Sequence, residues 1–262
     1  MDKAILLEKI NGYACIKLNR PECLNSFNQQ MHKELAGILD ELHHDDSIRA
    51  LILTGEGKGF CAGQDLSDRS VNQGDSPTDL GESVEHFYNP LIRRITAMPK
   101  PVICAVNGVA AGAGASIAMA CDIVIAAKKA SFILSFSKVG LVPDSGASWH
   151  LPRAIGLPRA KALALLGNRL DAETAESWGL VWQVVDGDVL MATAHAMATE
   201  LASRPTKAFA NIKRLLNESF SSPMAQQMES ERAAMQVLGF SHDYQEGVDA
   251  FLTKRTPIFT GK

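Results

Sequence analysis

The sequence lacks any hydrophobic run long enough to cross a membrane, which takes about 20 consecutive apolar residues. The longest candidate, VAAGAGASIAMACDIVIAA, is rich in glycine and is interrupted by Asp122. The first residues, MDKAILLEKINGYACIKLNR, mix charged and apolar side chains and lack the apolar core and cleavage site of a secretory signal. We therefore expect a cytoplasmic protein with no membrane partner.

Dense clusters of one charge are also absent. The chain carries 26 basic and 29 acidic residues, for a net charge of −3. This balance argues against a nucleic-acid partner and leaves small neutral or anionic ligands open. No Cys-x-x-Cys pair occurs, so we expect reduced thiols. The five cysteines are scattered and several lie in apolar runs: Cys15, Cys23, Cys61, Cys104 and Cys121.

Several signatures of common enzyme chemistry are missing. There is no Gly-x-Ser-x-Gly elbow for a nucleophile, and the seven histidines show no metal-binding spacing, so we predict no metal site. GAGASI at 112–117 resembles a dinucleotide fingerprint, but Ile117 stands where the third glycine belongs. Cys61 lies in a loop and is either a reactive thiol or a packed one.

The order of the remaining signals favours an α/β architecture, because short β-branched runs alternate with longer helical patterns. The Asn11-Gly12 turn predicts a hairpin, and residues 49–55 predict a buried strand. Asn25 and Ser26 are candidate N-caps of a helix that continues to about residue 42.

Composition divides the chain in two. Residues 67–81 are polar and rich in glycine and proline, which predicts a long surface loop ahead of a helix over 84–98. After Pro152 the sequence becomes rich in alanine and leucine. With 262 residues and 46% hydrophobic content, the chain can bury a large core. We expect a mixed core over 1–195 and a helical region over 196–262.

Two glycine-rich loops and one carboxylate are the candidate components of an active site. GKGFCAGQDL at 57–66 and GAGASI at 112–117 each follow a predicted strand, and small residues let a ligand approach the backbone. Two such loops can supply the two convergent N–H donors of an oxyanion hole. Asp144, in VPDSG, is either an N-cap or a working acid/base.

Four segments together resemble the crotonase, or enoyl-CoA hydratase/isomerase, superfamily, in its order and spacing. They are LNRPECLNSFN, LILTGEGKGFCAGQDL, PKPVICAVNGVAAGAGASIAMACDIVIAA and FSKVGLVPDSGASWHLPR. The resemblance implies a spiral of ββα turns, followed by C-terminal helices that build a homotrimer or hexamer. It also implies an acyl-CoA substrate and no cofactor beyond the CoA moiety of that substrate.

The same resemblance implies roles for individual residues. The backbone N–H groups of Gln64 and Ala113 would hold the thioester oxygen. Hydratases of the family use two glutamates, whose positions are Ser116 and Phe136 here, whereas Asp144 lies where isomerases of the family carry a catalytic aspartate. The CoA would lie along further residues, the last two from a neighbouring subunit: Arg20, Ala62, Asp65, Leu66, Phe251 and Lys254.

Within the family, FCAGQDL, VEHFYNPLIRRI, NGVAAGAGA, VPDSG and the ending EGVDAFLTKRTPIFTGK resemble the isomerases of aerobic phenylacetate degradation. This implies rearrangement of the ring epoxide of phenylacetyl-CoA to an oxepin, with 3,2-enoyl-CoA isomerisation as a second activity. The alternatives are a dedicated 3,2-enoyl-CoA isomerase of fatty-acid oxidation, a thioester hydrolase, and a non-catalytic acyl-CoA-binding subunit.

Overall fold

A six-stranded sheet is the centre of the computed structural model, which describes residues 3–65 and 79–262. The strand order is β1-β2-β3-β4-β6-β9, with only the β1–β2 pair antiparallel. The strands are β1 (Ile5–Ile10), β2 (Tyr13–Leu18), β3 (Ala50–Gly55), β4 (Val102–Val106), β6 (Ile123–Ala127) and β9 (Gln183–Val185). The predicted hairpin is confirmed, with Gly12 at φ 81° in its turn.

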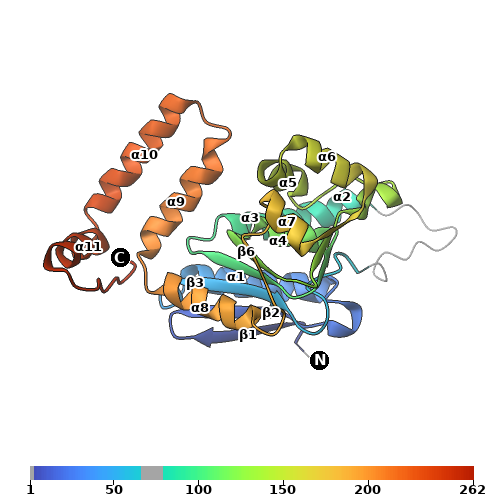
Figure 1. Cartoon of the computed structure of the whole chain (residues 1–262), viewed down its shortest axis with the longest axis horizontal. Coiled ribbons are helices and arrows are strands. Elements are labelled where there is room, and N and C mark those ends of the chain that lie inside the picture. Colours follow the sequence, from blue (N-terminus) through green and yellow to red (C-terminus); the bar gives the residue numbers. More distant parts are fainter. Residues whose placement is uncertain (1–2, 66–78) are drawn as a thin grey trace.

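A smaller sheet of three strands lies beside the main one. Its strands are β5 (Val109–Ala111), β7 (Ser131–Ile133) and β8 (Arg169–Asp171), in the order β5-β7-β8. The helices that connect or cover the strands up to residue 202 are α1 (Gln29–His44), α2 (Leu80–Ser83), α3 (Asn89–Thr96), α4 (Ala113–Ala120), α5 (Ala147–Ile155), α6 (Leu157–Leu166), α7 (Ala172–Trp178) and α8 (Leu190–Ala202). The mixed α/β architecture expected from the sequence is confirmed (Figure 1).

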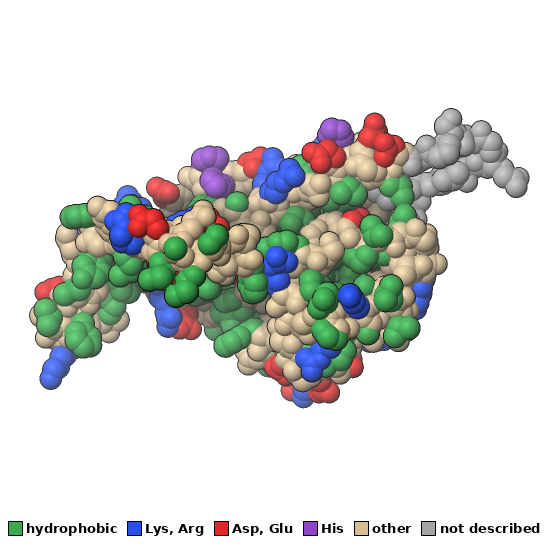
Figure 2. All heavy atoms as spheres, turned by 90° about the horizontal axis from the view of Figure 1, so that it is seen from above, with side chains coloured by type: hydrophobic (Ala, Val, Ile, Leu, Met, Phe, Trp, Pro, Cys, Tyr) green, Lys and Arg blue, Asp and Glu red, His purple; other side chains and the backbone are tan. Residues whose placement is uncertain are grey.

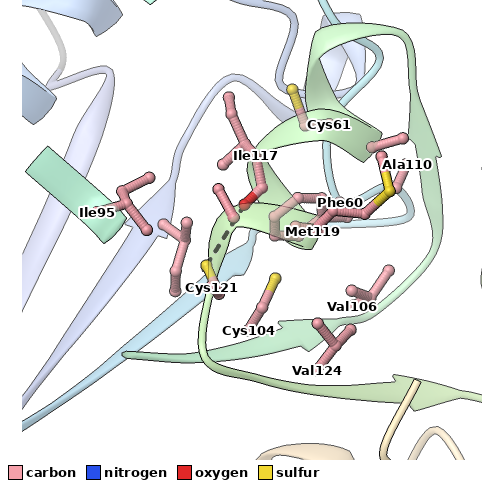
Figure 3. Packing of buried hydrophobic residues seen from close by; sticks show 14 of the residues in the cluster. Phe60, Cys61, Ile95, Cys104, Val106, Ala110, Ile117, Met119, Cys121 and Val124 are labelled. Carbon is pink, nitrogen blue, oxygen red and sulfur yellow. Dashed lines mark hydrogen bonds between the residues drawn. The ribbon is translucent and has the colours of Figure 1, made fainter. Parts of the chain in front are cut away.

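The central strands β2, β3, β4 and β6 of the main sheet are buried on both faces, which explains their nearly continuous apolar sequences. Successive side chains of a strand point to opposite faces. Thus Leu51 and Leu53 join the larger core, with α1 and α4, whereas Ala50 and Ile52 face α8. Around α4 the packing is dense, with Cys104, Met119 and Val124 close together (Figure 3).

Beyond α8, three helices leave the body of the molecule as an arm (Figure 1). They are α9 (Thr206–Ser219), α10 (Met224–Gly239) and α11 (His242–Thr253). The predicted boundary at residue 195 falls inside α8, whose Ala194 and Ala198 both pack on the sheet. The part that separates from the sheet therefore begins at Thr206.

The predicted caps of the first helix are wrong. Asn28 is the N-cap of α1, and its side chain accepts a hydrogen bond from the Met31 N–H at 2.9 Å. Asn25 instead adopts a left-handed conformation and donates through Nδ2 to the carbonyl oxygens of Glu56, Gly59 and Phe60 at 3.0–3.1 Å. The sequence suggests a helix cap because asparagine is favoured both at N-caps and at left-handed turn positions. Asn25 takes the turn position because three backbone carbonyl groups converge on its side chain.

The predicted polar loop over 67–81 lies mostly outside the described residues. From Asp79, which caps α2, the chain runs helically to Thr96, with a π-helical turn over Val84–Tyr88. No helix in the described ranges is both long and apolar enough to span a bilayer. All five cysteine thiols are free.

Candidate active site

The two glycine-rich loops lie against each other. Ala111 N–H donates to the Cys61 carbonyl at 2.8 Å, which joins the strand ends of the two loops. A Cβ atom added to Gly63 would lie 2.9 Å from Ala111 O and 3.3 Å from Ala113 N. Only a residue without a side chain permits this approach, and Gly63 also has a φ of 92°. The structure thus brings together the loops that the sequence analysis paired.

The peptide between Gly63 and Gln64 has a fixed orientation. Phe27 forms a parallel bridge to Gln64, in which the Phe27 N–H donates to Gly63 O at 2.7 Å and Asp65 N–H donates to Phe27 O at 2.9 Å. Because the C=O and N–H of a trans peptide point in opposite directions, the Gln64 N–H faces away from Phe27. It makes no hydrogen bond to any described group.

Ala113 is the first residue of α4, where N–H groups lack partners within the helix and the positive end of the helix dipole lies. Gly112 reaches this position with φ 51° and ψ −127°, a conformation that favours glycine. A Cβ on Gly114 would lie 2.3 Å from Cys61 O, so the helix start is pressed against the first loop. The two amides predicted to form an oxyanion hole therefore lie on touching segments.

Asp144 lies beside the same helix. Ser116 Oγ, one turn after Ala113, donates to Gly112 O at 3.3 Å and to the backbone carbonyl of Asp144 at 3.1 Å. The Asp144 carboxylate is half-buried and accepts a hydrogen bond from Ser145 Oγ at 2.9 Å. The N-cap of α5 is Gly146, without a side-chain cap, so Asp144 is not the helix cap that the sequence allowed.

Ser116 and Phe136, the positions that the family resemblance assigns to the hydratase glutamates, both lie close to the start of α4. Ser116 is fully buried on α4. Phe136 lies in a 3₁₀ turn over Ser135–Val139, and its ring would be 3.8 Å from a Cβ on Gly112. Because Ser116 and Phe136 carry no carboxylate, Asp144 is the carboxylate at this end of α4 among the described residues. The arrangement can polarise a carbonyl and move one proton.

Of the residues predicted to contact CoA, three lie at the loop that carries Gln64: Arg20, Ala62 and Asp65. Arg20 Nη1 pairs with Asp65 Oδ2 at 2.9 Å and also donates to Ser26 O at 2.7 Å. Ala62 N–H donates to Leu24 O at 2.9 Å. These bonds brace the loop that carries Gln64, and the guanidinium of Arg20 is already engaged. Leu66 lies outside the described residues.

Phe251 and Lys254 lie on the arm, at the end of α11 (Figure 1). The structure does not bring them to the Gln64 loop of their own chain. The Phe251 side chain is 81% exposed, and Lys254 ends the helix in a left-handed conformation. Their predicted contact with the CoA of a neighbouring subunit stays a prediction.

Two features of the site were settled only by the structure. Burial raises the pKa of the Cys61 thiol to about 12, so Cys61 is a packed thiol and not a reactive one. Tyr88, which the sequence analysis did not single out, donates through its hydroxyl to Gln64 Oε1 at 2.8 Å. No cluster of potential metal ligands occurs in the part of the chain that the structure describes.

Comparisons with known proteins identify the family of the chain. Residues 8–262 match the enoyl-CoA hydratase/isomerase family, and the chain belongs to that family of acyl-CoA hydratases and isomerases. It is 54% identical, over the full length of both chains, to 1,2-epoxyphenylacetyl-CoA isomerase of Escherichia coli K12. It is 35% identical, over 99% of both chains, to trans-2-decenoyl-acyl-carrier-protein isomerase of Streptococcus mutans.

Solved structures confirm the crotonase fold predicted from the resemblance. A crystal structure of an enoyl-CoA hydratase/isomerase from Mycobacterium abscessus superposes with a TM-score of 0.94 at 39% identity. It covers 99% of this chain and 100% of its own. DspI of Pseudomonas aeruginosa superposes with a TM-score of 0.92 at 32% identity, covering 98% of this chain and 97% of its own.

Proposed function

We propose that the protein isomerises ring-1,2-epoxyphenylacetyl-CoA to the oxepin-CoA, and that it also shifts the double bond of 3-enoyl-CoA esters to the 2-position. The observation that carries the proposal is Asp144, the carboxylate that lies beside α4 among the described residues, while Ser116 and Phe136 stand where the family resemblance places the hydratase glutamates. The 54% identity to an isomerase of that epoxide supports the choice of substrate.

The proposed mechanism divides two tasks between backbone and side chain. The N–H groups of Gln64 and Ala113 hold the thioester oxygen and stabilise the enolate that forms when a proton leaves the adjacent carbon. Losing one such donor typically costs about 2.7–4 kcal/mol of barrier. Asp144 takes up the proton and returns it to another carbon of the same substrate. In the epoxide, the bond between the two oxygen-bearing ring carbons also breaks, which expands the six-membered ring to the seven-membered oxepin. One carboxylate suffices because no water is added.

The first test compares the wild type with Asp144→Asn on epoxidised phenylacetyl-CoA and on 3-hexenoyl-CoA. The amide keeps the shape but removes the base, so we expect kcat to fall about 10²- to 10⁴-fold on both substrates. Binding of the CoA ester should persist. Asp188→Asn, an exposed aspartate with the same chemical change, is the matched control and should retain full activity.

Other outcomes select the alternatives. Full activity of Asp144→Asn contradicts the proton-transfer role. Turnover of 3-hexenoyl-CoA alone would indicate a dedicated 3,2-enoyl-CoA isomerase, and release of free CoA would indicate a thioester hydrolase. A wild type that binds both esters and converts neither would indicate a binding subunit.

We further propose that the arm assembles the chain into a homotrimer or hexamer. Figure 2 shows hydrophobic side chains gathered on the arm. Those at least half exposed include Leu216, Phe220, Met224, Met228, Met235, Phe240, Phe251 and Leu252. A surface of this kind is typical of a protein interface. Light scattering should give three or six copies, and Phe240→Ser with Phe251→Ser should lower that number; a monomeric wild type contradicts the proposal.

A further inference from the structure

Gln64 is fixed by its backbone and also by its side chain. Phe27 sets the direction of the Gly63–Gln64 peptide through one hydrogen bond of 2.7 Å. Gly63 precedes that peptide, and glycine has the least restricted backbone of all residues. A catalytic donor on such a segment needs further support, because small displacements weaken an oxyanion contact.

The side chain of Gln64 supplies this support through Tyr88. The Tyr88 hydroxyl donates to Gln64 Oε1 at 2.8 Å, and Gln64 Nε2 donates to the Asp65 carbonyl at 3.3 Å. The two bonds orient the amide group and, through it, the main chain of the loop.

Tyr88 is itself held firmly. Its side chain is 1% exposed, and its ring meets the His32 ring edge-on, with centroids 4.6 Å apart. Phe27, which orients the Gly63–Gln64 peptide, lies 6.3 Å from the Tyr88 ring. Tyr88 ends the π-helical turn over Val84–Tyr88. Such turns widen a helix locally and often occur at functional sites.

We propose that Tyr88 is a positioning residue of the oxyanion site, whose hydroxyl keeps the Gln64 N–H aimed at the thioester oxygen. This inference rests on the proposed function, since it assigns a purpose to that donor. Tyr88 acts through Gln64 and needs no contact with the substrate. Tyr88 therefore stabilises the enolate, in which negative charge accumulates on the oxygen, more than it stabilises the bound ester.

Tyr88→Phe removes the hydroxyl and keeps the buried ring. We expect kcat to fall about 5- to 10-fold with KM within about twofold, the size expected for losing one neutral hydrogen bond that supports a transition-state contact. Tyr13→Phe is the matched control, because Tyr13 is also buried and its hydroxyl bonds to His195 Nδ1 at 3.0 Å on the other face of the sheet. The control should leave kcat unchanged.

A double-mutant cycle separates positioning from general packing. Gln64→Leu removes the acceptor, so Tyr88→Phe should have no further effect in that background. A second readout does not need turnover: acetoacetyl-CoA becomes an enolate that absorbs in the near ultraviolet when the carbon between its two carbonyl groups loses a proton to a base, and an oxyanion site stabilises that enolate. Tyr88→Phe should weaken this band by a factor similar to its effect on kcat.

The outcomes distinguish the two proposals. Unchanged kcat and enolate band in Tyr88→Phe, additive effects in the cycle, or an equal loss in Tyr13→Phe would overturn the role of Tyr88. If the wild type converts neither substrate but shows the enolate band, the proposed function fails and the cycle, measured on the band, still tests Tyr88. A wild type that converts neither substrate and binds acetoacetyl-CoA without the band overturns both.

Discussion

The helices α4 and α10 show how differently the two parts of this chain are stabilised. All eight residues of α4 are buried, whereas α10, with sixteen residues, buries only Ala234. Isolated helices are marginal in water, and most of their stability in proteins comes from packing. The core therefore holds α4 in place from all sides, while α10 has most of its surface left for contacts outside its own fold.

The arm nevertheless has defined attachments to the body. Lys213 of α9 pairs with Asp122, and Arg49 of the body donates to Thr206 Oγ1 and to the carbonyl oxygens of Arg204 and Phe259. Within the arm itself, Asp243 of α11 accepts hydrogen bonds from the Thr260 and Gly261 N–H groups at the chain end. The arm is thus held by a few polar contacts, whereas apolar packing holds the core.

The largest expected effect comes from adding one methyl group to the core. In Gly114→Ala the new Cβ would lie 2.3 Å from Cys61 O, a backbone atom that cannot move without disturbing both loops of the site. We expect destabilisation by more than about 4 kcal/mol, or no soluble protein, measured by urea unfolding and yield. Gly239→Ala at the end of α10, where the new Cβ would have no neighbour within 4 Å outside the helix's own backbone, should change stability by less than about 0.5 kcal/mol. Equal effects would contradict the contrast between the two regions.

The next effect concerns the ion pair between arm and body. Lys213 Nζ lies 2.7 Å from Asp122 Oδ2, and both groups are mostly buried. Lys213→Met leaves this carboxylate without its cation, which should cost about 1–3 kcal/mol at neutral pH. Lys128→Met, which breaks the exposed pair with Asp186, is the control and should cost less than about 0.5 kcal/mol.

The pH dependence of Lys213→Met has a definite sign. Burial raises the pKa of Asp122, and Lys213 opposes that rise, so the substitution raises the pKa of Asp122 further. The folded variant then binds a proton more readily than the unfolded chain. Its stability should increase as the pH falls through the raised pKa, because the neutral carboxyl needs no cation. A cost that does not shrink toward acid pH would contradict this account.

A smaller, local effect is expected at the end of the chain. Burial tends to raise the pKa of Asp243, but the Thr260 and Gly261 N–H groups, each at 2.7 Å, help to bring it below its usual value. Asp243→Asn weakens these bonds and should cost about 1–2 kcal/mol, seen as faster hydrogen exchange of the two amides. Glu231→Gln, an exposed change on α10, is the control.

The wild type should show the same loosening in acid. Because the folded pKa of Asp243 is lowered, its contribution to stability is full above the usual aspartate range and disappears as the pH falls through the lowered pKa. Exchange of the Thr260 and Gly261 amides should therefore accelerate in acid before that of the core strands. Simultaneous acceleration in both regions would show that the arm is not a separately attached part.

Much of the architecture followed from local signals. The hairpin at Gly12 and the strand predicted over 49–55, found over Ala50–Gly55, were both predicted, because each depends on residues close in sequence. The cap of α1 was mispredicted, since Asn25 satisfies carbonyls more than thirty residues away. The predicted boundary at residue 195 falls inside α8, because the burial of this helix depends on a sheet built from strands distant in sequence.

By itself, the sequence determined that two glycine loops and one aspartate were the parts to examine, because glycine and an isolated carboxylate have strong local meaning. Tertiary structure alone decided that Gly63 lies against the start of α4, that Ser116 bonds to the Asp144 carbonyl, and that Tyr88 donates to Gln64. These contacts join segments far apart in the chain. No local pattern encodes them, since they exist only once the core has packed.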